Sequence, residues 1–387
     1  MSIHSADEPL LHRALELARQ GIGLASPNPH VGGLITDPAG NVVGTGIYTY
    51  DGLKHAEILA LETAGEKARG GTLYINLEPH AHQGRTPPCT DALIAAGIRR
   101  VVASMADPNP KVSGRGFEQL RAAGVLVEVG GLEEHARRLN EGFARYVRHG
   151  VPLVTLKSAM TLDGKIAPSP NQARQADEHG FAGLWITGAA AREHVHQLRH
   201  ENDAILVGIG TILADNPLLT DRRGLPRRRP LLRVILDSGL RLPADSRMVR
   251  NLAQESRQDV LVFCATADDS RMAELEGLGV RVERVPSLEN GRPDLRAALR
   301  RLGELAITSV MIEGGSRVNR AALAAGIVDK IFLYYSPQVV GGTESVPFAA
   351  DEAFDPAGLG FRAQNIRLHR FAEDVAIEGY LRSPYEE

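Results

Sequence analysis

The residues between His55 and Cys89 include the side chains that bind transition metals most readily. A His-Ala-Glu motif occupies residues 55–57, His80 follows a Glu-Pro pair, and Cys89 follows two prolines. Imidazole nitrogen and thiolate sulfur are good zinc ligands, so His55, His80 and Cys89 are the candidate ligands of a zinc ion. Glu57 would not bind the ion. A carboxylate beside a zinc site can instead carry the proton that hydrolysis requires.

These side chains need two helix starts to position them. Residues two apart on a helix point about 200° apart, so His55 and Glu57 can face one ion only if a helix begins between them. The apolar residues 58–61 and the later Gly65 fit such a helix. Two prolines directly before Cys89 predict a second helix start there, and a helix N-terminus favours the metal-binding thiolate.

The order of these residues is typical of zinc-dependent nucleobase deaminases, in which His-x-Glu precedes a proline-borne ligand and a later cysteine. The second ligand in that pattern is a cysteine, whereas here it is His80, with the nearby His82 as a rival for the position. Each piece alone has an ordinary interpretation, because a single cysteine often fills a core and a His-Ala-Glu triplet often starts a surface helix. The combination in this order favours the metal site.

Length and composition limit the class of protein. A chain of 387 residues suggests two domains, with three as the alternative, and 43% hydrophobic residues suffice for folded cores. The net charge of −3 and the aromatic content of 5% argue against a nucleic-acid-binding surface. Two cysteines, Cys89 and Cys264, exclude a disulfide framework, and no apolar stretch resembles a signal sequence or a membrane span. We therefore expect a cytoplasmic protein.

Strands and helices are expected to alternate along the chain, which predicts an α/β layer fold. The pattern restarts near Gly150, so we expect one domain over residues 1–150 and another over residues 151–387. Residues 133–143 are expected to form a single helix.

Two loops are candidate ligand contacts. The Pro27-Asn28-Pro29 loop is stiff and could present the Asn28 amide to a substrate, although an ordinary turn is an equal alternative. Residues 313–316, Glu-Gly-Gly-Ser, lie between an expected strand and an expected helix over 318–325. Backbone amides bind phosphate at such a place, but glycine pairs also occur there without any ligand.

Motifs in both halves resemble the bifunctional riboflavin-biosynthesis deaminase/reductase family over nearly the whole chain. The matching residues of the first half are 27–29, 31–32, 55–57, 77–79, 82, 84–89 and 107–110. Those of the second half are 162–167, 185–188, 204–208, 210–211, 215–217 and 313–315.

The resemblance implies a cytidine-deaminase-like three-layer domain followed by a dihydrofolate-reductase-like domain. The first would use Zn²⁺ to remove the 2-amino group of 2,5-diamino-6-(5-phosphoribosylamino)pyrimidin-4(3H)-one. The second would use NADPH to reduce the ribosyl group of the product to ribityl. Relatives assemble through the reductase domain, so a homo-oligomer is expected.

The resemblance also implies the site residues. Its cofactor-binding positions are Met160, Trp185, Thr211, Asp215, Gly315, Ser316, Arg317, Val318 and Asn319. Its substrate-binding positions are Asn28, Arg85, Gly183, Arg199, Leu219, Arg222 and Glu313. Arginine suits a phosphorylated substrate because its planar guanidinium bonds two oxygens at once. Core packing is the alternative role for the single tryptophan.

Three residues depart from the family pattern: His80 replaces a cysteine, Tyr48 a histidine and Gly183 a serine. The two departures in the first half leave an alternative open, in which the protein is a reductase and its N-terminal half is a degenerate, inactive domain. A nucleic-acid deaminase would share the zinc motif, but the acidic net charge and the attached reductase half argue against it.

Overall fold

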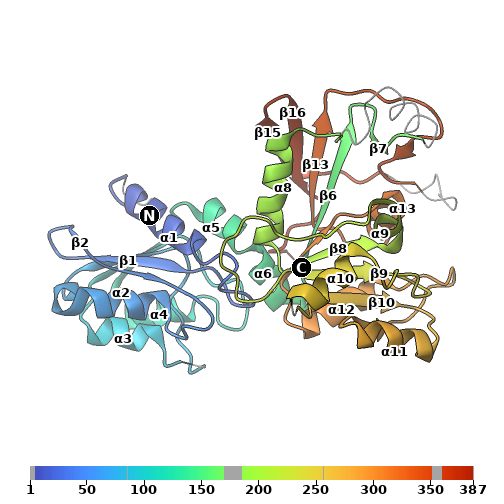
Figure 1. Cartoon of the computed structure of the whole chain (residues 1–387). Helices are drawn as coiled ribbons and strands as arrows, with labels where there is room; N and C mark the ends of the chain where they lie inside the picture. The colour runs from blue at the N-terminus through green and yellow to red at the C-terminus, as the bar shows by residue number, and fades with distance from the viewer. Residues whose placement is uncertain (1–4, 85, 170–184, 256, 351–359, 387) are drawn as a thin grey trace. The chain divides into compact units, whose positions relative to one another are not determined.

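The computed structural model describes residues 5–84, 86–169, 185–255, 257–350 and 360–386 (Figure 1). These residues divide into two units with separate cores. One unit extends to Gly150 and also includes Pro226–Arg229, and the other comprises Val151–Leu225 and Pro230–Glu386.

The first unit is built on a five-stranded sheet in the order β2-β1-β3-β4-β5. β1 pairs antiparallel with β2 and with β3, whereas β3, β4 and β5 run parallel. The strands are β1 (Gly32–Thr36), β2 (Val42–Ile47), β3 (Thr72–Ile75), β4 (Arg100–Ala103) and β5 (Leu126–Val129).

Helices cover both faces of this sheet, because successive strand residues point to opposite sides. On β1, Leu34 packs with Leu11 of α1, and the next residue, Ile35, packs in a cluster with Ala60 of α2 and Leu93 of α3. The result is a three-layer α/β/α unit, as expected. Its helices are α1 (Glu8–Arg19), α2 (Ala56–Ala64), the 3-10 helix η1 (Gly65–Ala68), α3 (Cys89–Ala95), α4 (Arg115–Ala122), α5 (Glu133–Leu139) and α6 (Glu141–His149).

The two expected helix starts are confirmed. α2 begins directly after its N-cap, His55, and ends at Gly65, whose positive φ of 55° suits glycine. α3 begins at Cys89 with Pro88 as its N-cap.

The single helix expected over residues 133–143 is wrong, because α5 ends at Leu139 and α6 begins at Glu141. Asn140 between them has non-helical dihedrals, φ −111° and ψ 16°. Its side chain accepts a hydrogen bond from the backbone N–H of His30 (2.7 Å) and donates one to the His30 carbonyl (3.1 Å). This clamp on a residue far away in sequence breaks the helix.

The second unit contains a nine-stranded sheet in the order β11-β10-β9-β8-β12-β6-β13-β16-β15. The first seven strands in this order run parallel, and the last three form antiparallel pairs. The strands are β6 (Leu153–Thr161), β8 (Ala204–Gly208), β9 (Leu232–Leu236), β10 (Val260–Cys264), β11 (Arg281–Arg284), β12 (Ser309–Ile312), β13 (Lys330–Ser336), β15 (Gln364–Phe371) and β16 (Asp374–Tyr380); β7 (Lys165–Ala167) pairs separately with β14 (Val346–Pro347).

Two apolar clusters fill the two faces of the parallel part. Val234 of β9 belongs to the cluster that includes α12 and α13, and Ile235 belongs to the one that includes α10 and α11. The helices are α8 (Ala189–Glu201), α9 (Ile209–Asp215), α10 (Arg247–Glu255), α11 (Asp269–Gly277), α12 (Leu295–Glu304) and α13 (Ser316–Ala324). No helix in the described ranges combines the length and apolar character that crossing a bilayer requires.

Candidate active sites

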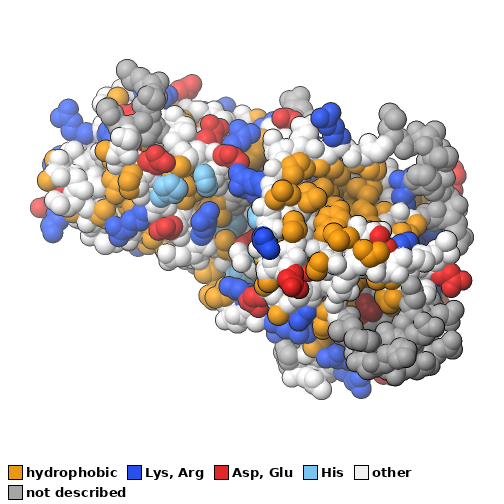
Figure 2. All heavy atoms as spheres, turned by 90° about the horizontal axis from the view of Figure 1, so that it is seen from above, with side chains coloured by type: hydrophobic (Ala, Val, Ile, Leu, Met, Phe, Trp, Pro, Cys, Tyr) orange, Lys and Arg blue, Asp and Glu red, His pale blue; other side chains and the backbone are white. Residues whose placement is uncertain are grey.

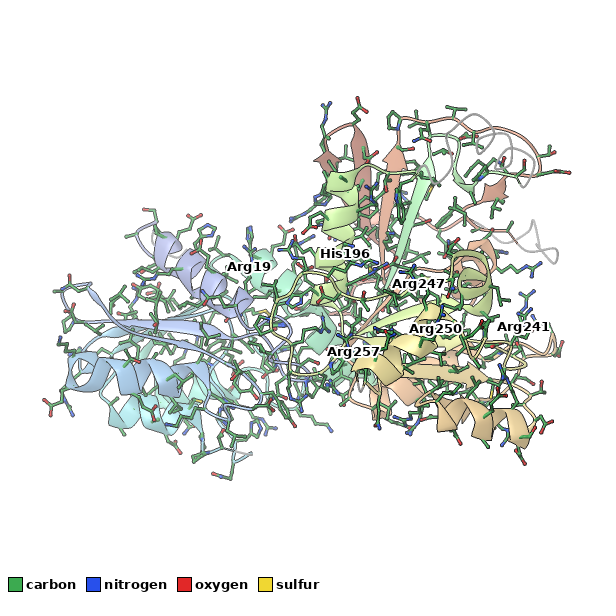
Figure 3. All side chains as sticks on the ribbon, in the orientation of Figure 1. Arg19, His196, Arg241, Arg247, Arg250 and Arg257 are labelled. Atoms are coloured by element: carbon green, nitrogen blue, oxygen red, sulfur yellow. The ribbon has the colours of Figure 1, made fainter. Side chains whose placement is uncertain are left out.

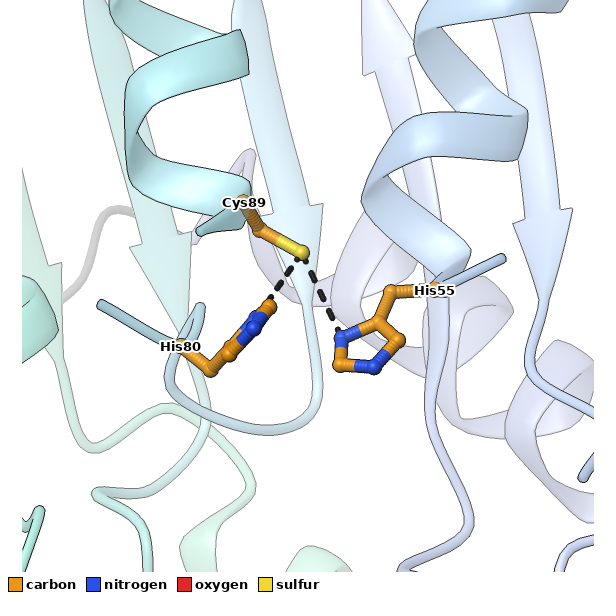
Figure 4. A group of neighbouring side chains, drawn as sticks. All are labelled: His55, His80 and Cys89. Carbon is orange, nitrogen blue, oxygen red and sulfur yellow. Dashed lines mark hydrogen bonds between the residues drawn. The ribbon is translucent and has the colours of Figure 1, made fainter. Parts of the chain in front are cut away.

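Three side chains with metal-binding atoms meet where α2 and α3 begin (Figure 4). Sγ of Cys89 lies 3.1 Å from Nδ1 of His80 and 3.4 Å from Nδ1 of His55. The ligand atoms of the three residues all lie within 4.8 Å of one another. The backbone N–H of Cys89 donates to the His80 carbonyl (3.0 Å), which ties the His80 loop to the start of α3.

These three residues fit a tetrahedral zinc ion. Zn–N distances of about 2.0–2.1 Å and a Zn–S distance of about 2.3 Å place adjacent ligand atoms roughly 3.4–3.6 Å apart. The observed sulfur–nitrogen distances of 3.1 and 3.4 Å are close to these values. A site with three protein ligands keeps a fourth position for water or substrate, which distinguishes catalytic from structural zinc sites.

The protonation states of the two histidines also suit a metal. Burial, followed by the charges of His80 and His82, lowers the pKa of His55 to about 4. Burial and then His82 also lower the pKa of His80. Both imidazoles are therefore neutral near pH 7, which is the form that binds a metal.

The thiol of Cys89 behaves differently from the expectation based on its helix start. Burial and the carboxylate of Glu57 raise its pKa, so the protein alone favours the protonated thiol. Metal binding would then have to release this proton.

Glu57 is the buried carboxyl group of this site, with 2% of its surface exposed. Burial raises its pKa to about 7, although hydrogen bonds from its own backbone N–H and from Cys89 oppose the rise. A group with a pKa near the operating pH can both accept and release a proton, which suits general acid–base catalysis.

Asn28 and Tyr48 lie beside the metal-binding group. The side-chain amide of Asn28 donates to the Tyr48 hydroxyl (2.6 Å), and the Tyr48 ring contacts His55 edge-on at 5.3 Å between centroids. His82 is exposed, and although its ring lies 5.2 Å from that of His80, it is outside the group with convergent ligand atoms.

The second candidate site lies at the carboxyl ends of the adjacent parallel strands β8 and β12. β12 leads into Glu313, Gly314 and the N-cap of α13, Gly315. A Cβ atom on Gly314 would lie 2.7 Å from Val318, so glycine is needed for this helix to approach the strand. Among the described residues, a Cβ atom on Gly315 would meet only the Thr211 hydroxyl, at 3.9 Å, so these residues leave the backbone here open to a ligand.

The other expected cofactor positions differ in exposure. Ser316 accepts a hydrogen bond from the Ala350 N–H (2.7 Å), and Asn319 donates to the Phe348 carbonyl (2.9 Å), so these side chains hold the 348–350 segment.

Val318 packs against Gly208 and Gly314, Met160 is buried, and Asp215 and Arg317 are exposed. Trp185 is 69% exposed, with Arg192 over its ring at 5.1 Å, which excludes core packing.

Glu313 lies at the centre of a charged group. It accepts hydrogen bonds from Arg199 on α8 (2.7 and 3.0 Å) and lies 3.5 Å from Nζ of Lys157 on β6. Burial alone would raise the pKa of Glu313, but the charges of Arg199 and Lys157 lower it to about 2. Lys157 was not expected here; the signal in the sequence was a charged residue within a strand that is expected to be buried.

Leu219 and Arg222 follow α9 and run beside α8. Leu219 is buried, so only its backbone, in the left-handed region at φ 53°, is available to a substrate. Arg222 is exposed and acts electrostatically on His196 of α8 (Figure 3): burial, Arg199 and Arg222 all lower the pKa of His196. Arg85 and Gly183, two further expected substrate positions, lie outside the described residues.

Two family models match the chain. The cytidine and deoxycytidylate deaminase zinc-binding region matches residues 4–105, which include the three candidate metal ligands. The RibD C-terminal domain matches residues 152–377, which include the glycine segment and the charged group around Glu313.

Two riboflavin biosynthesis proteins RibD illustrate the similarity in sequence. That of Actinobacillus pleuropneumoniae is 39% identical over 379 residues, which cover 98% of this chain and 96% of the relative. That of Escherichia coli is 39% identical over 346 residues, which cover 87% of this chain and 89% of the relative.

Solved structures give the same result. RibD from Acinetobacter baumannii superposes with a TM-score of 0.81 at 32% identity, covering 97% of this chain and 98% of its own. A diaminohydroxyphosphoribosylaminopyrimidine deaminase/5-amino-6-(5-phosphoribosylamino)uracil reductase from Thermotoga maritima superposes with a TM-score of 0.75 at 36% identity, covering 96% of this chain and 98% of its own.

Proposed function

Because the chain belongs to the RibD family of bifunctional riboflavin-biosynthesis enzymes, we propose that its deaminase and reductase activities divide between the two units at Gly150 and Val151. Residues 1–150 carry zinc-dependent deamination of 2,5-diamino-6-(5-phosphoribosylamino)pyrimidin-4(3H)-one. Residues 151–387 carry NADPH-dependent reduction of the ribosyl group, which yields 5-amino-6-(5-phosphoribitylamino)uracil. The ranges matched by the two family models, 4–105 and 152–377, support this boundary.

His55, His80 and Cys89 are the zinc ligands in this proposal. The supporting observation is that their ligand atoms lie within 4.8 Å of one another, beside a buried carboxyl group. When bound, zinc supplies the Lewis acidity that makes water a nucleophile near neutral pH.

Glu57 moves the proton in deamination. Its carboxylate accepts the proton that water loses on attacking the pyrimidine carbon, and then donates it to a nitrogen of the substrate. A pKa of about 7 leaves the carboxyl group able to do both. Asn28 contacts the pyrimidine from the rim of the same site, and Arg85 is a proposed phosphate contact.

NADPH supplies the hydride for the reduction. The open backbone at Gly315 and the N-terminus of α13 support cofactor-phosphate binding, because N–H groups at a helix start favour anions. We assign the cofactor to the neighbourhood of Thr211, Gly315 and the exposed Trp185. Met160, Asp215, Ser316, Arg317, Val318 and Asn319 complete the proposed cofactor positions.

The charged group around Glu313 prepares the reductase site for a phosphorylated substrate. Arg199 and Lys157 together carry two positive charges, and Glu313 carries one negative charge, so the group has a net positive charge. Glu313 accepts two hydrogen bonds from Arg199, and the Thr220 carbonyl accepts a third, so the guanidinium is held in a fixed orientation. A planar guanidinium held in this way suits the binding of a phosphate. Gly183, the backbone at Leu219, and Arg222 are the remaining proposed contacts.

A homo-oligomer through the second unit is also proposed. Leu333, Ile377 and Leu368 form one cross-strand row on β13, β16 and β15, and Leu368 is 71% exposed. Figure 2 shows hydrophobic side chains gathered on the second unit. Leu333 and Ile377 are partly exposed, and an apolar row of this kind across three strands is typical of a protein interface. Light scattering tests this: Leu368→Glu should lower the oligomeric mass, and an unchanged mass excludes this face.

We propose a cytosolic location, where the unpaired thiols of Cys89 and Cys264 stay reduced. Redox-sensitive labelling of the two thiols in cells tests this.

Product analysis tests the proposed function. The purified protein is given the diaminopyrimidine phosphate, first without and then with NADPH, and the products are identified by mass. Deamination alone without NADPH, and the ribityl product with it, are expected. A protein that reduces the deaminated substrate but never deaminates would support the reductase-only alternative, against which the convergent His55, His80 and Cys89 argue.

A further inference from the structure

Asn28 is held in a fixed place at the edge of the deaminase site. Prolines on both sides restrict its backbone, and its N–H donates to the Ala25 carbonyl (3.0 Å). The residue is half-buried, so part of its side chain remains open to a ligand. A primary amide can present either its oxygen or its NH2 group, depending on which way it is turned.

A hydrogen bond to Tyr48 fixes the orientation of the Asn28 side-chain amide. The backbone N–H of Tyr48 donates to the Val31 carbonyl (2.9 Å), and the Tyr48 side chain is 4% exposed, so the ring has little freedom. The hydroxyl of Tyr48 accepts a hydrogen bond of 2.6 Å from Nδ2 of Asn28. Oδ1 of Asn28 has no hydrogen-bond partner within the part of the chain that the structure describes.

The same tyrosine connects the amide to the metal-binding group. Its ring meets His55 edge-on, at 5.3 Å between centroids and 81° between planes. Asn28, Tyr48 and His55 therefore form a continuous series of contacts that ends at a proposed metal ligand.

We propose that Tyr48 is a positioning residue. Its hydroxyl accepts a hydrogen bond from the NH2 group of Asn28, which turns the Asn28 oxygen toward an N–H donor of the pyrimidine. This inference rests on the proposed deaminase function. The diaminopyrimidinone offers such donors beside the reacting carbon, in its ring N–H and its exocyclic amino group. The site thereby favours a pyrimidine that donates a hydrogen bond to Asn28 over one that has only hydrogen-bond acceptors at that edge.

The Tyr48→Phe variant tests the proposal, because it removes the hydroxyl and keeps the ring against His55. The KM for the diaminopyrimidine phosphate should rise about fivefold, the size of one neutral hydrogen bond, while kcat changes by less than about twofold. Zinc content and reductase activity should stay at wild-type levels. Tyr74→Phe is the matched control, because it removes a buried hydroxyl, bonded to Asp7 at 2.8 Å, elsewhere in the unit.

A double-mutant cycle shows whether Tyr48 acts through Asn28. In an Asn28→Leu background, Tyr48→Phe should cause no further rise in KM. If the two substitutions raise KM by independent factors that multiply in the double variant, Tyr48 contacts the substrate itself and the proposal is wrong. Asn28→Asp keeps an acceptor at this position and should bind the substrate better than Asn28→Leu. If Asn28→Asp binds no better, the amide presents its NH2 group instead, and the proposal is wrong.

These results separate the inference from the function on which it rests. A wild-type protein without deaminase activity would remove the function itself. Normal wild-type deamination with an unchanged KM in a zinc-loaded Tyr48→Phe variant would remove only the role of Tyr48.

Discussion

Nδ1 of His80 lies closer to Sγ of Cys89 than Nδ1 of His55 does, at 3.1 Å against 3.4 Å. The histidine that occupies a cysteine position of the family is thus as well placed for zinc as the histidine of the His-Ala-Glu motif. A second imidazole in place of a thiolate would remove one negative charge from the proposed ligands, which would make a zinc ion held there a stronger Lewis acid.

Zinc analysis of His80→Ala and His82→Ala will identify the ligand. The His80→Ala protein should purify with far less zinc and little deaminase activity, whereas His82→Ala should retain both, since His82 is exposed. Acidification should release zinc from the wild type, because a ligating histidine must be deprotonated. Full zinc occupancy in His80→Ala would rule out His80 as a ligand.

Glu57→Gln should separate the two activities. Loss of a general acid–base group lowers the rate by about 100- to 10,000-fold, so deamination should fall within that range. Reduction of the pre-deaminated substrate should stay near the wild-type rate. Glu62→Gln is the matched control, because Glu62 is an exposed residue of the same helix, paired with Lys54 at 2.6 Å. Equal loss of both activities in Glu57→Gln would contradict independent sites.

Gly315→Val should weaken cofactor binding without unfolding the second unit. The described residues leave room for the new Cβ, which would meet only the Thr211 hydroxyl at 3.9 Å, but the side chain would occupy the open backbone where a phosphate is proposed. The apparent KM for NADPH should rise about tenfold or more, the effect of roughly 1.4 kcal/mol. Gly277→Val in α11, another glycine with open space, is the control. An unchanged KM would place the cofactor elsewhere.

Glu313→Gln should destabilise the protein in a pH-dependent way. Removing one partner of a buried ion pair costs about 3–5 kcal/mol, because Arg199 and Lys157 are then buried without it. The folded pKa of Glu313, about 2, lies below its ordinary value of 4.5. Its contribution to stability is therefore present above about pH 4.5 and lost as the pH falls toward 2.

Denaturant unfolding of the wild type and Glu313→Gln from about pH 7 to about pH 3 measures this effect. The difference in unfolding free energy should be largest near neutrality and shrink in acid. Glu304→Gln, which removes an exposed partner of Arg301, should show a small difference. A constant difference across the range would show that Glu313 is not ionised in the folded protein.

The sequence predicted those parts of the fold that depend on local signals. The prolines before Cys89 mark a helix start by restricting the backbone, and Gly65 marks the end of α2 because glycine tolerates a positive φ. Both helix ends are where they were expected. The antiparallel pair β15–β16 was not expected, because residues 364–371 are mostly polar and exposed and lack an apolar strand pattern. α9 and α10 were also missed.

The parts of the sites that the sequence could not provide depend on distant partners. Lys157 meets Glu313 across 156 positions, and the Asn28 contact with Tyr48 depends on how the loop before β1 folds against the residue after β2. The motif spacing selected His55, His80 and Cys89, which the structure brings together, and their binding of zinc stays a prediction.

The clamp of Asn140 on His30 means that the deaminase is larger than its recognisable motif region. That region ends at residue 105, yet the backbone two residues after Asn28 is tied down from residue 140, between the last two helices of the unit. A fragment cut just after the motif region would keep every proposed metal ligand and lose the clasp on the loop that carries Asn28. The smallest excisable deaminase is therefore expected to extend beyond Asn140.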